Sequence, residues 1–182
     1  MKVLIAEDDP NTREGLCEIL RGEGYHVIAA PNGREAWESF QEHQPDVVCL
    51  DVMMPEMDGY EVCRKIRSQS DEPAILFITA KSEEIDAVLG LELGADDFIQ
   101  KPFGVKEVVA RIRAVTRRIF KSRKQQESSV KQADFTMADL TVVEDELRGF
   151  RGGEAIELSL RDIQILKLLY RNQGRALSRD AF

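Results

Sequence analysis

Four apolar runs of this 182-residue sequence each end in residues whose side chains could take part in chemistry. In chain order these residues are Glu7 with Asp8, then Asp51, Thr79 and Lys101. Carboxylates are suitable ligands for Mg²⁺, and a carboxylate can attack phosphorus to form an acyl phosphate. A hydroxyl and an ammonium group can donate hydrogen bonds to phosphoryl oxygens. The combination favours metal-assisted phosphoryl transfer with Asp51 as the acceptor.

Taken one at a time, these residues have plainer interpretations. The acidic run at residues 7–9 could form a helix cap in a solvated loop, and Thr79 could bond to the backbone at a strand end. Lys101-Pro102 could be an ordinary loop, or a cis peptide bond that aims the lysine. The interpretation as a site depends on all four strand ends meeting in one place.

The elements that must position these residues are predicted to alternate strictly between strand and helix over residues 1–121. Strands are predicted at residues 3–6, 26–29, 46–50, 75–78 and 97–100. Helices are predicted at residues 10–22, 33–43, from 59 onward, 82–94 and 105–120, the first capped by Asp9 and the third by Asp58. This alternation predicts a parallel sheet with helices on both faces. The carboxyl ends of its strands then share one edge, where such folds bind ligands.

A second, smaller folding unit is predicted beyond residue 132. Residues 122–132 are polar, and we predict an interdomain linker there. Short strand patterns at residues 140–143, 147–150 and 155–158 then predict a small antiparallel sheet. Ser159 is expected to cap a helix over residues 160–171, and Ser178 a further one. The apolar face of the first helix, with Ile163, Leu166 and Tyr170, could pack on its own sheet, on the first unit or on a second copy.

Composition and charge limit the classes of protein that fit. No apolar run approaches the roughly 20 residues that span a bilayer, and the amino terminus lacks a signal-peptide pattern, so we expect a cytoplasmic protein without membrane contact. Cys17, Cys49 and Cys63 lack metal-site spacing and are expected in the core. Residues 1–110 carry 10 basic and 23 acidic side chains, whereas residues 111–182 carry 15 and 10. The acidic part suits a cation, and only the second part could approach nucleic acid.

A family resemblance rests on motifs in this order and spacing. The motifs are Glu7-Asp8-Asp9, Asp51-Val-Met-Met-Pro-Glu-Met-Asp-Gly59, Thr79-Ala80 and Lys101-Pro102-Phe103. They resemble the receiver domain of two-component response regulators over residues 1–121. The resemblance implies a flavodoxin-like (βα)5 fold with a doubly wound parallel sheet. It also implies phosphotransfer to Asp51 from the phosphohistidine of a sensor histidine kinase.

The same resemblance implies roles for individual residues. It assigns Mg²⁺ to Asp8, Asp51, the backbone carbonyl of Met53 and, through water, Glu7. Thr79 and Lys101 would contact the phosphoryl group. Thr79 and Phe98 would form a switch pair, in which Thr79 turns toward the phosphoryl group and the ring of Phe98 moves inward.

Gly94-Ala95-Asp96-Asp97-Phe98 resembles the subfamily with OmpR/PhoB-type winged-helix outputs. That resemblance implies a homodimer, formed on phosphorylation through the fourth helix, the fifth strand and the fifth helix. The residues implied in this interface are Asp96, Asp97, Glu107, Arg111 and Arg118, with Asp97 paired to Arg111 and Asp96 to Arg118. Ala87 stands where the subfamily usually has a basic residue opposite Glu107, so we expect a weaker or altered dimer.

Residues 133–182 resemble the amino-terminal part of a winged-helix domain. Leu158 to Leu166 match the pattern of its first helix, and Gly174 to Arg179 match its turn into the second. A recognition helix and a wing are expected after these elements, and neither is found within the 182 residues. We therefore expect these residues alone not to bind DNA specifically, and expect DNA as a partner only of a longer chain.

Two other functions remain open from the residues. The chain could be a regulator without DNA output, which acts through protein contacts or as a phosphate sink. It could also be a phosphatase with an aspartate nucleophile. A phosphatase of that kind would need a second catalytic carboxylate two residues after Asp51, and Met53 occupies that position. We therefore expect a regulator, with phosphorylation and its reversal at Asp51 as the only chemistry.

Overall fold

The computed structural model describes residues 1–80, 92–126 and 135–175. Contacts divide the chain into two compact units, Met1–Ile119 and Phe120–Phe182. Among the described residues, no helix is both long and apolar enough to cross a membrane.

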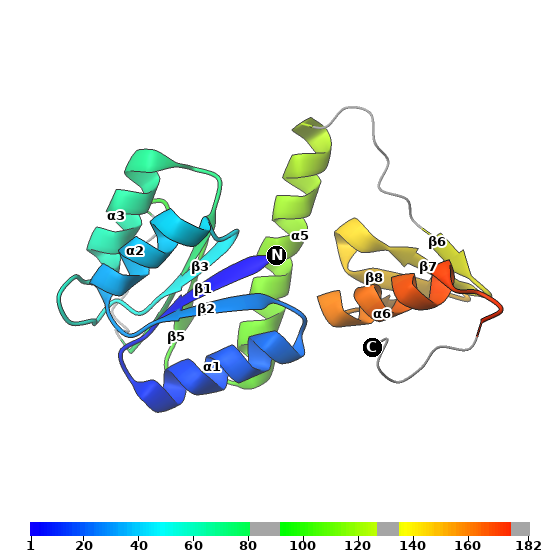
Figure 1. The fold of residues 1–182 in the computed structure, drawn as a ribbon, viewed down its shortest axis with the longest axis horizontal. Helices are drawn as coiled ribbons and strands as arrows, with labels where there is room; N and C mark the ends of the chain where they lie inside the picture. The colour runs from blue at the N-terminus through cyan, green and yellow to red at the C-terminus, as the bar shows by residue number, and fades with distance from the viewer. Residues whose placement is uncertain (81–91, 127–134, 176–182) are drawn as a thin grey trace. The chain divides into compact units, whose positions relative to one another are not determined.

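The first unit is built on a five-stranded parallel sheet (Figure 1). Its strands are β1 (Lys2–Ala6), β2 (His26–Ala30), β3 (Val47–Leu50), β4 (Ala74–Thr79) and β5 (Asp97–Gln100). They lie in the order β2-β1-β3-β4-β5, and every neighbouring pair is parallel. The predicted strands and the predicted parallel sheet are confirmed. The order places the carboxyl ends of β1, β3, β4 and β5 next to one another.

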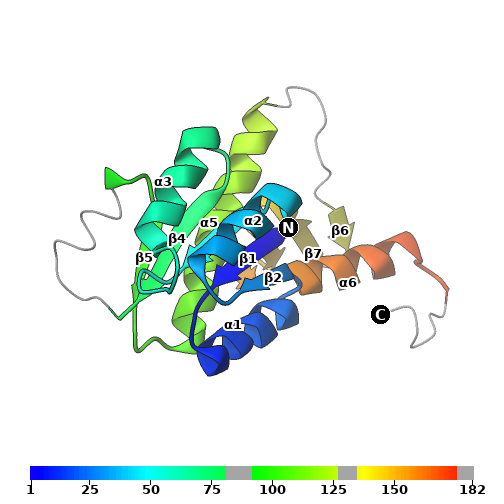
Figure 2. The same ribbon diagram turned by 60° about the vertical axis from the view of Figure 1, so that its left-hand side comes forward.

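Helices cover both faces of this sheet, as Figures 1 and 2 show. They are α1 (Pro10–Gly22), α2 (Gly33–His43), α3 (Gly59–Gln69) and α5 (Val105–Gln126). On one face, α2 and α3 contribute Phe40, Val62 and Ile66 to a core shared with the strands. The strands β3 and β4 are buried at every position, as expected for strands with helices on both sides. The three cysteines are also buried, which confirms their predicted place in the core.

Side-chain caps begin three of these helices directly after the polar edge of the sheet. Asp9 accepts a hydrogen bond from the backbone N–H of Thr12 at 2.7 Å, and Asp58 accepts one from that of Glu61 at 2.7 Å. Asn32 caps α2 in the same way. Each cap satisfies a backbone donor that the first helical turn leaves unpaired. The predicted caps at Asp9 and Asp58 are confirmed.

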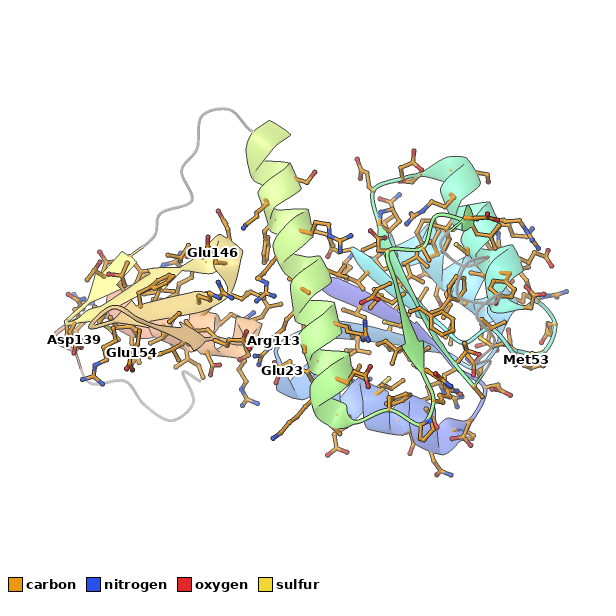
Figure 3. All side chains as sticks on the ribbon, turned by 180° about the vertical axis from the view of Figure 1, so that it is seen from behind. Glu23, Met53, Arg113, Asp139, Glu146 and Glu154 are labelled. Atoms are coloured by element: carbon orange, nitrogen blue, oxygen red, sulfur yellow. The ribbon has the colours of Figure 1, made fainter. Side chains whose placement is uncertain are left out.

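Two contacts tie α5 to the connection between α1 and β2. The hydroxyls of Tyr25 and Thr116 lie 3.1 Å apart, and both side chains are buried. Arg113 donates two hydrogen bonds to Oε2 of Glu23, at 2.6 and 3.0 Å, and Figure 3 labels this pair beside α5. These contacts fix the helix that follows Lys101.

The end of α5 differs from the sequence-based expectation. The helix continues to Gln126, beyond the predicted end at Phe120 and into the segment 122–132 that was expected to be a linker. Residues 122–126 contain neither glycine nor proline, and Lys, Arg and Gln are good helix formers, so the helix continues through them. Residues 127–134 lie outside the described residues. The expected helix at 82–94 falls mainly on residues 81–91, which are also outside them.

The second unit contains a four-stranded antiparallel sheet and a helix. The elements are β6 (Phe135–Met137), β7 (Leu140–Val143), a 3-10 turn η1 (Glu144–Glu146), β8 (Arg148–Arg151), β9 (Glu154–Glu157) and α6 (Leu160–Arg171). Ser159 and Asp162 form a reciprocal capping box at the start of α6, which confirms the predicted cap. Ile163 and Leu166 pack on the core of this sheet, and the ring of Tyr170 lies tilted against that of Phe135, with centroids 4.9 Å apart. The apolar face of α6 thus packs on its own sheet. The helix expected at Ser178 lies outside the described residues.

Candidate functional site

The register of the sheet brings the predicted polar residues together. Ala6 pairs with Leu50 across β1 and β3, and the backbone N–H of Asp51 donates to the carbonyl of Ala6 at 2.8 Å. Glu7 and Asp51 therefore leave the sheet side by side. At the other side of the edge, the N–H of Lys101 donates to the carbonyl of Thr79 at 2.8 Å.

Lys101 joins the two carboxylates at the centre of this edge. Its Nζ lies 2.5 Å from Oδ2 of Asp51 and 2.8 Å from Oε1 of Glu7. Lys101 is 50 positions from Asp51 and 94 positions from Glu7 in the chain, so the fold alone brings them into contact. The peptide bond between Lys101 and Pro102 is cis, as the sequence allowed.

Burial determines the electrostatics of this group. Glu7 and Asp51 are buried, and the side chain of Lys101 is 20% exposed. Burial raises the pKa of Glu7, and the hydrogen bond and charge of Lys101 offset only part of that effect. Burial lowers the pKa of Lys101, but the hydrogen bonds and the negative charges of Asp51 and Glu7 together outweigh burial, so the net change in this pKa is upward. Lys101 is consequently charged at neutral pH.

The acidic residues at this edge fit a hard cation. One carboxylate oxygen from each of Glu7, Asp8 and Asp51 can be chosen so that the three atoms lie within 4.8 Å of one another. Oε2 of Glu7 is 2.6 Å from Nζ of Lys101, but the hydrogen bond of that ammonium goes to Oε1. The buried Oε2 atom has no hydrogen-bond partner among the described residues. The Lys101 ammonium offsets part of the cost of burying this carboxylate, and carboxylate oxygens of this kind are also the ligands that Mg²⁺ prefers.

The loop after β3 holds Asp51 from the other side. The backbone N–H of Met53 donates to Oδ1 of Asp51 at 3.0 Å, and Met53 itself is 60% exposed. Figure 3 labels Met53. Gly59 begins α3 directly beneath this loop, and its N–H donates to the carbonyl of Val52 at 3.0 Å. A Cβ atom at Gly59 would lie 2.2 Å from the carbonyl oxygen of Asp51. The loop can take this course only because residue 59 has no side chain.

The residues expected to form a switch lie on the two neighbouring strands. Thr79 is fully buried at the carboxyl end of β4. Phe98 lies on β5 opposite Phe77, and its half-buried ring packs against the core on the side of α2 and α3. The expected movement of this pair remains a prediction.

The residues expected at a dimer interface form ion pairs within one chain. Arg111 donates to both carboxylate oxygens of Asp97, at 3.0 and 3.1 Å, and also contacts Glu107. Arg118 donates to Oδ1 of Asp96 at 3.2 Å. Pairing across a two-fold axis remains a prediction, and Ala87 lies outside the described residues.

Two arginines near the predicted residues were not singled out from the sequence. Arg67 donates to Oδ2 of Asp96 at 3.2 Å and to the carbonyl oxygens of Gly94 and Pro73. Arg13 donates to the backbone carbonyls of the residues that supply two of the three acids. The available signal for Arg13 was its position one helical turn after Asp9, on a helix that starts at the site.

Comparison with known proteins supports one family. The model of the response regulator receiver domain matches residues 3–113. The chain is 38% identical over 181 residues to the alkaline phosphatase synthesis transcriptional regulatory protein PhoP of Bacillus subtilis, an alignment that covers 98% of this chain and 75% of that protein.

Solved receiver domains have the same fold as the first unit. The BeF3-activated receiver domain of Klebsiella pneumoniae RstA has a TM-score of 0.60 and 32% identity, and the match covers 63% of this chain and 97% of that one. A chain of the CheX-CheY-BeF3-Mg²⁺ complex from Borrelia burgdorferi has a TM-score of 0.61 and 32% identity, with 63% and 88% covered. The chain therefore belongs to the two-component response regulators, with a receiver domain followed by residues of a transcription-regulatory output domain.

Proposed function

We propose that Asp51 accepts a phosphoryl group from the phosphohistidine of a sensor histidine kinase. The observation that carries this proposal is the environment of its carboxylate. Oδ2 contacts the Lys101 ammonium at 2.5 Å, and Oδ1 accepts the N–H of Met53 at 3.0 Å. These two contacts orient Asp51 at the carboxyl edge of the sheet, where it forms with Glu7 and Asp8 the acidic group that fits a cation.

In the proposed reaction an oxygen of Asp51 attacks phosphorus. An O–P bond forms, the N–P bond of the phosphohistidine breaks, and the imidazole nitrogen keeps the electron pair and takes up a proton. Because donor and acceptor are both anionic, positive charge is needed between them. The Lys101 ammonium, already in contact with Asp51, provides a fixed part of that charge.

Asp8, Asp51, the Met53 carbonyl and, through water, Glu7 are the residues that would hold Mg²⁺. The close approach of the carboxylates of Glu7, Asp8 and Asp51 supports this assignment. When bound, the ion would offset negative charge on the phosphoryl oxygens. The related CheX-CheY-BeF3-Mg²⁺ complex from Borrelia burgdorferi also includes this ion, which supports the assignment.

The proposed output is a change at the fourth helix, β5 and α5. Thr79 and Phe98 would move together after phosphorylation, and the fourth helix, β5 and α5 would then form a dimer through Asp96, Asp97, Glu107, Arg111 and Arg118. Because these residues are already paired within the chain, dimerisation would exchange ion pairs and gain few new ones. Similarity to the transcriptional regulator PhoP supports control of DNA binding as the final effect.

A direct test is reaction with a small acyl phosphate and Mg²⁺, followed by intact mass. We expect one added phosphoryl group on the parent chain and none on Asp51→Asn. Asp58→Asn is the matched control, because Asp58 is an exposed acid in the same loop and asparagine can still cap α3. Equal phosphorylation of parent and Asp51→Asn would contradict the proposal. Turnover of a generic phosphate ester beyond one equivalent would instead favour a phosphatase.

A further inference from the structure

Arg13 links α1 to the end of β1 through backbone contacts. Its Nη1 atom donates to the carbonyl oxygen of Glu7 at 2.7 Å and to that of Asp8 at 3.1 Å. One guanidinium nitrogen therefore holds two consecutive peptide groups. Both peptides belong to residues whose carboxylates form the acidic group with Asp51.

The two residues differ in how else they are held. Glu7 is buried, its N–H donates to the carbonyl of Ala30, and its carboxylate contacts Lys101. Asp8 is exposed, and among the described residues the structure gives it one hydrogen bond, which is the bond from Arg13. The orientation of the Asp8 peptide, and with it the direction of its carboxylate, consequently depends on Arg13 more than on any other described side chain.

We propose that Arg13 is a positioning residue for the cation site. It would hold the backbone of Glu7 and Asp8 so that their carboxylates are oriented before the ion binds. The inference rests on the proposed function, since it concerns the same site. Residues that orient metal ligands typically change metal affinity by about 10–100-fold when they are replaced.

Charge and positioning predict opposite results at this residue, which makes the inference testable. The Arg13 guanidinium contacts the backbone of two residues of the acidic group, and a positive charge there repels a cation. Its removal should therefore strengthen Mg²⁺ binding if charge were all that mattered. Loss of the two backbone contacts should weaken Mg²⁺ binding, because the Asp8 peptide would have to be ordered when the ion binds. The sign of the change therefore separates the two effects.

The experiment is a calorimetric Mg²⁺ titration of the whole 182-residue chain and three variants, with thermal unfolding of each in the absence of Mg²⁺. Arg13→Met removes the donors and the charge but keeps an apolar stem. Arg13→Lys keeps the charge on a shorter side chain. Arg21→Met is the matched control, because Arg21 lies on the same helix and is exposed.

We expect Mg²⁺ binding about tenfold weaker in Arg13→Met, intermediate in Arg13→Lys, and within twofold of the parent in Arg21→Met. Mg²⁺ binding to a folded Arg13→Met that equals or exceeds that of the parent overturns the inference. If Arg13→Met does not fold, Arg13→Lys decides, and an affinity equal to the parent's overturns the inference. Absence of Mg²⁺ binding in the parent would instead refute the cation site itself, and the inference with it.

Discussion

Replacement of Gly59 by alanine should damage both stability and the site. The added Cβ would lie 2.2 Å from the carbonyl oxygen of Asp51, 3.0 Å from its carbonyl carbon and 3.1 Å from Cα of Val52. All three are backbone atoms at the end of β3, so no flexible side chain can move aside. Either α3 or the loop that carries Asp51 has to shift.

The size of the effect follows from two opposing contributions. Overpacking of a dense interior costs about 1–3 kcal/mol. Alanine in place of glycine in a helix recovers at most about 1 kcal/mol. Because the clash is with backbone atoms, the overpacking cost should lie at the upper end of its range, which leaves a net loss of about 2 kcal/mol. At roughly 3–6 °C per kcal/mol for a unit of about 120 residues, the melting temperature should fall by roughly 6–12 °C.

Function should suffer more than stability. Asp51 contacts Lys101 at 2.5 Å, and a displacement of about 1 Å between reacting groups can cost 100-fold in rate. We expect the rate of phosphorylation by a small acyl phosphate to fall at least about tenfold, at a temperature where Gly59→Ala is still folded.

The matched control is Gly15→Ala in α1, where a Cβ would meet nothing within 4 Å. That change should stabilise the protein by about 0.5–1 kcal/mol, which is the opposite sign. Trp37 is the only tryptophan and packs on the core of the first unit, so its fluorescence on heating follows this unit. A melting temperature of Gly59→Ala equal to or above that of the parent would refute the steric argument.

Three further predictions follow from contacts around the sheet. Tyr25→Phe removes a buried hydrogen bond to Thr116 and should cost about 1 kcal/mol in urea denaturation; no loss would show that this bond does not hold α5. Lys101→Met leaves the two carboxylates that Lys101 contacts without their ammonium partner, and should lower the free energy of unfolding by about 2–3 kcal/mol in the absence of Mg²⁺. This loss is smaller than for a fully buried pair because Lys101 is partly exposed. A smaller gain in stability from added Mg²⁺ in the variant than in the parent would contradict this account. Burial raises the pKa of Cys49 from 9.0 to about 12, so its protonated form stabilises the fold below pH 9 and this contribution is lost as pH rises toward 12. Stability should then fall by up to about 1.4 kcal/mol per pH unit more steeply in the parent than in Cys49→Ala; parallel pH profiles from urea denaturation at pH 8 to 11 would exclude that role.

Much of the site was predictable because parallel strands end at a common edge. An apolar run followed by a polar residue was enough to place Glu7, Asp51 and Lys101 together, although they are distant in the chain. The sequence could not specify that one ammonium contacts both carboxylates. That arrangement depends on the register of β1 against β3 and on the course of the loop after β5.

Backbone contacts explain what sequence reasoning missed. Gly59 belongs to a turn-rich stretch in which a glycine needs no special explanation, so its close approach to Asp51 left no separate signal. An arginine on an amphipathic helix is expected to face solvent, and the reach of Arg13 to two carbonyls depends on its rotamer.

Charge pairing shows a related limit. The sequence identified Asp97 and Arg111 as partners, and the structure pairs them within the chain. Complementary charge indicates which groups attract each other, but only three-dimensional position determines whether both belong to one copy. The predicted end of α5 at Phe120 was wrong, because no glycine or proline near that residue marks the end of a helix and α5 continues to Gln126.

The most direct test of the central claim is to locate the phosphoryl group. The phosphorylated chain would be reduced with borohydride, which converts an aspartyl phosphate to homoserine, then digested and sequenced by mass spectrometry. We predict homoserine at position 51 and at no other position. Homoserine at Asp8 or Asp58 with an unmodified Asp51 would contradict the proposed function.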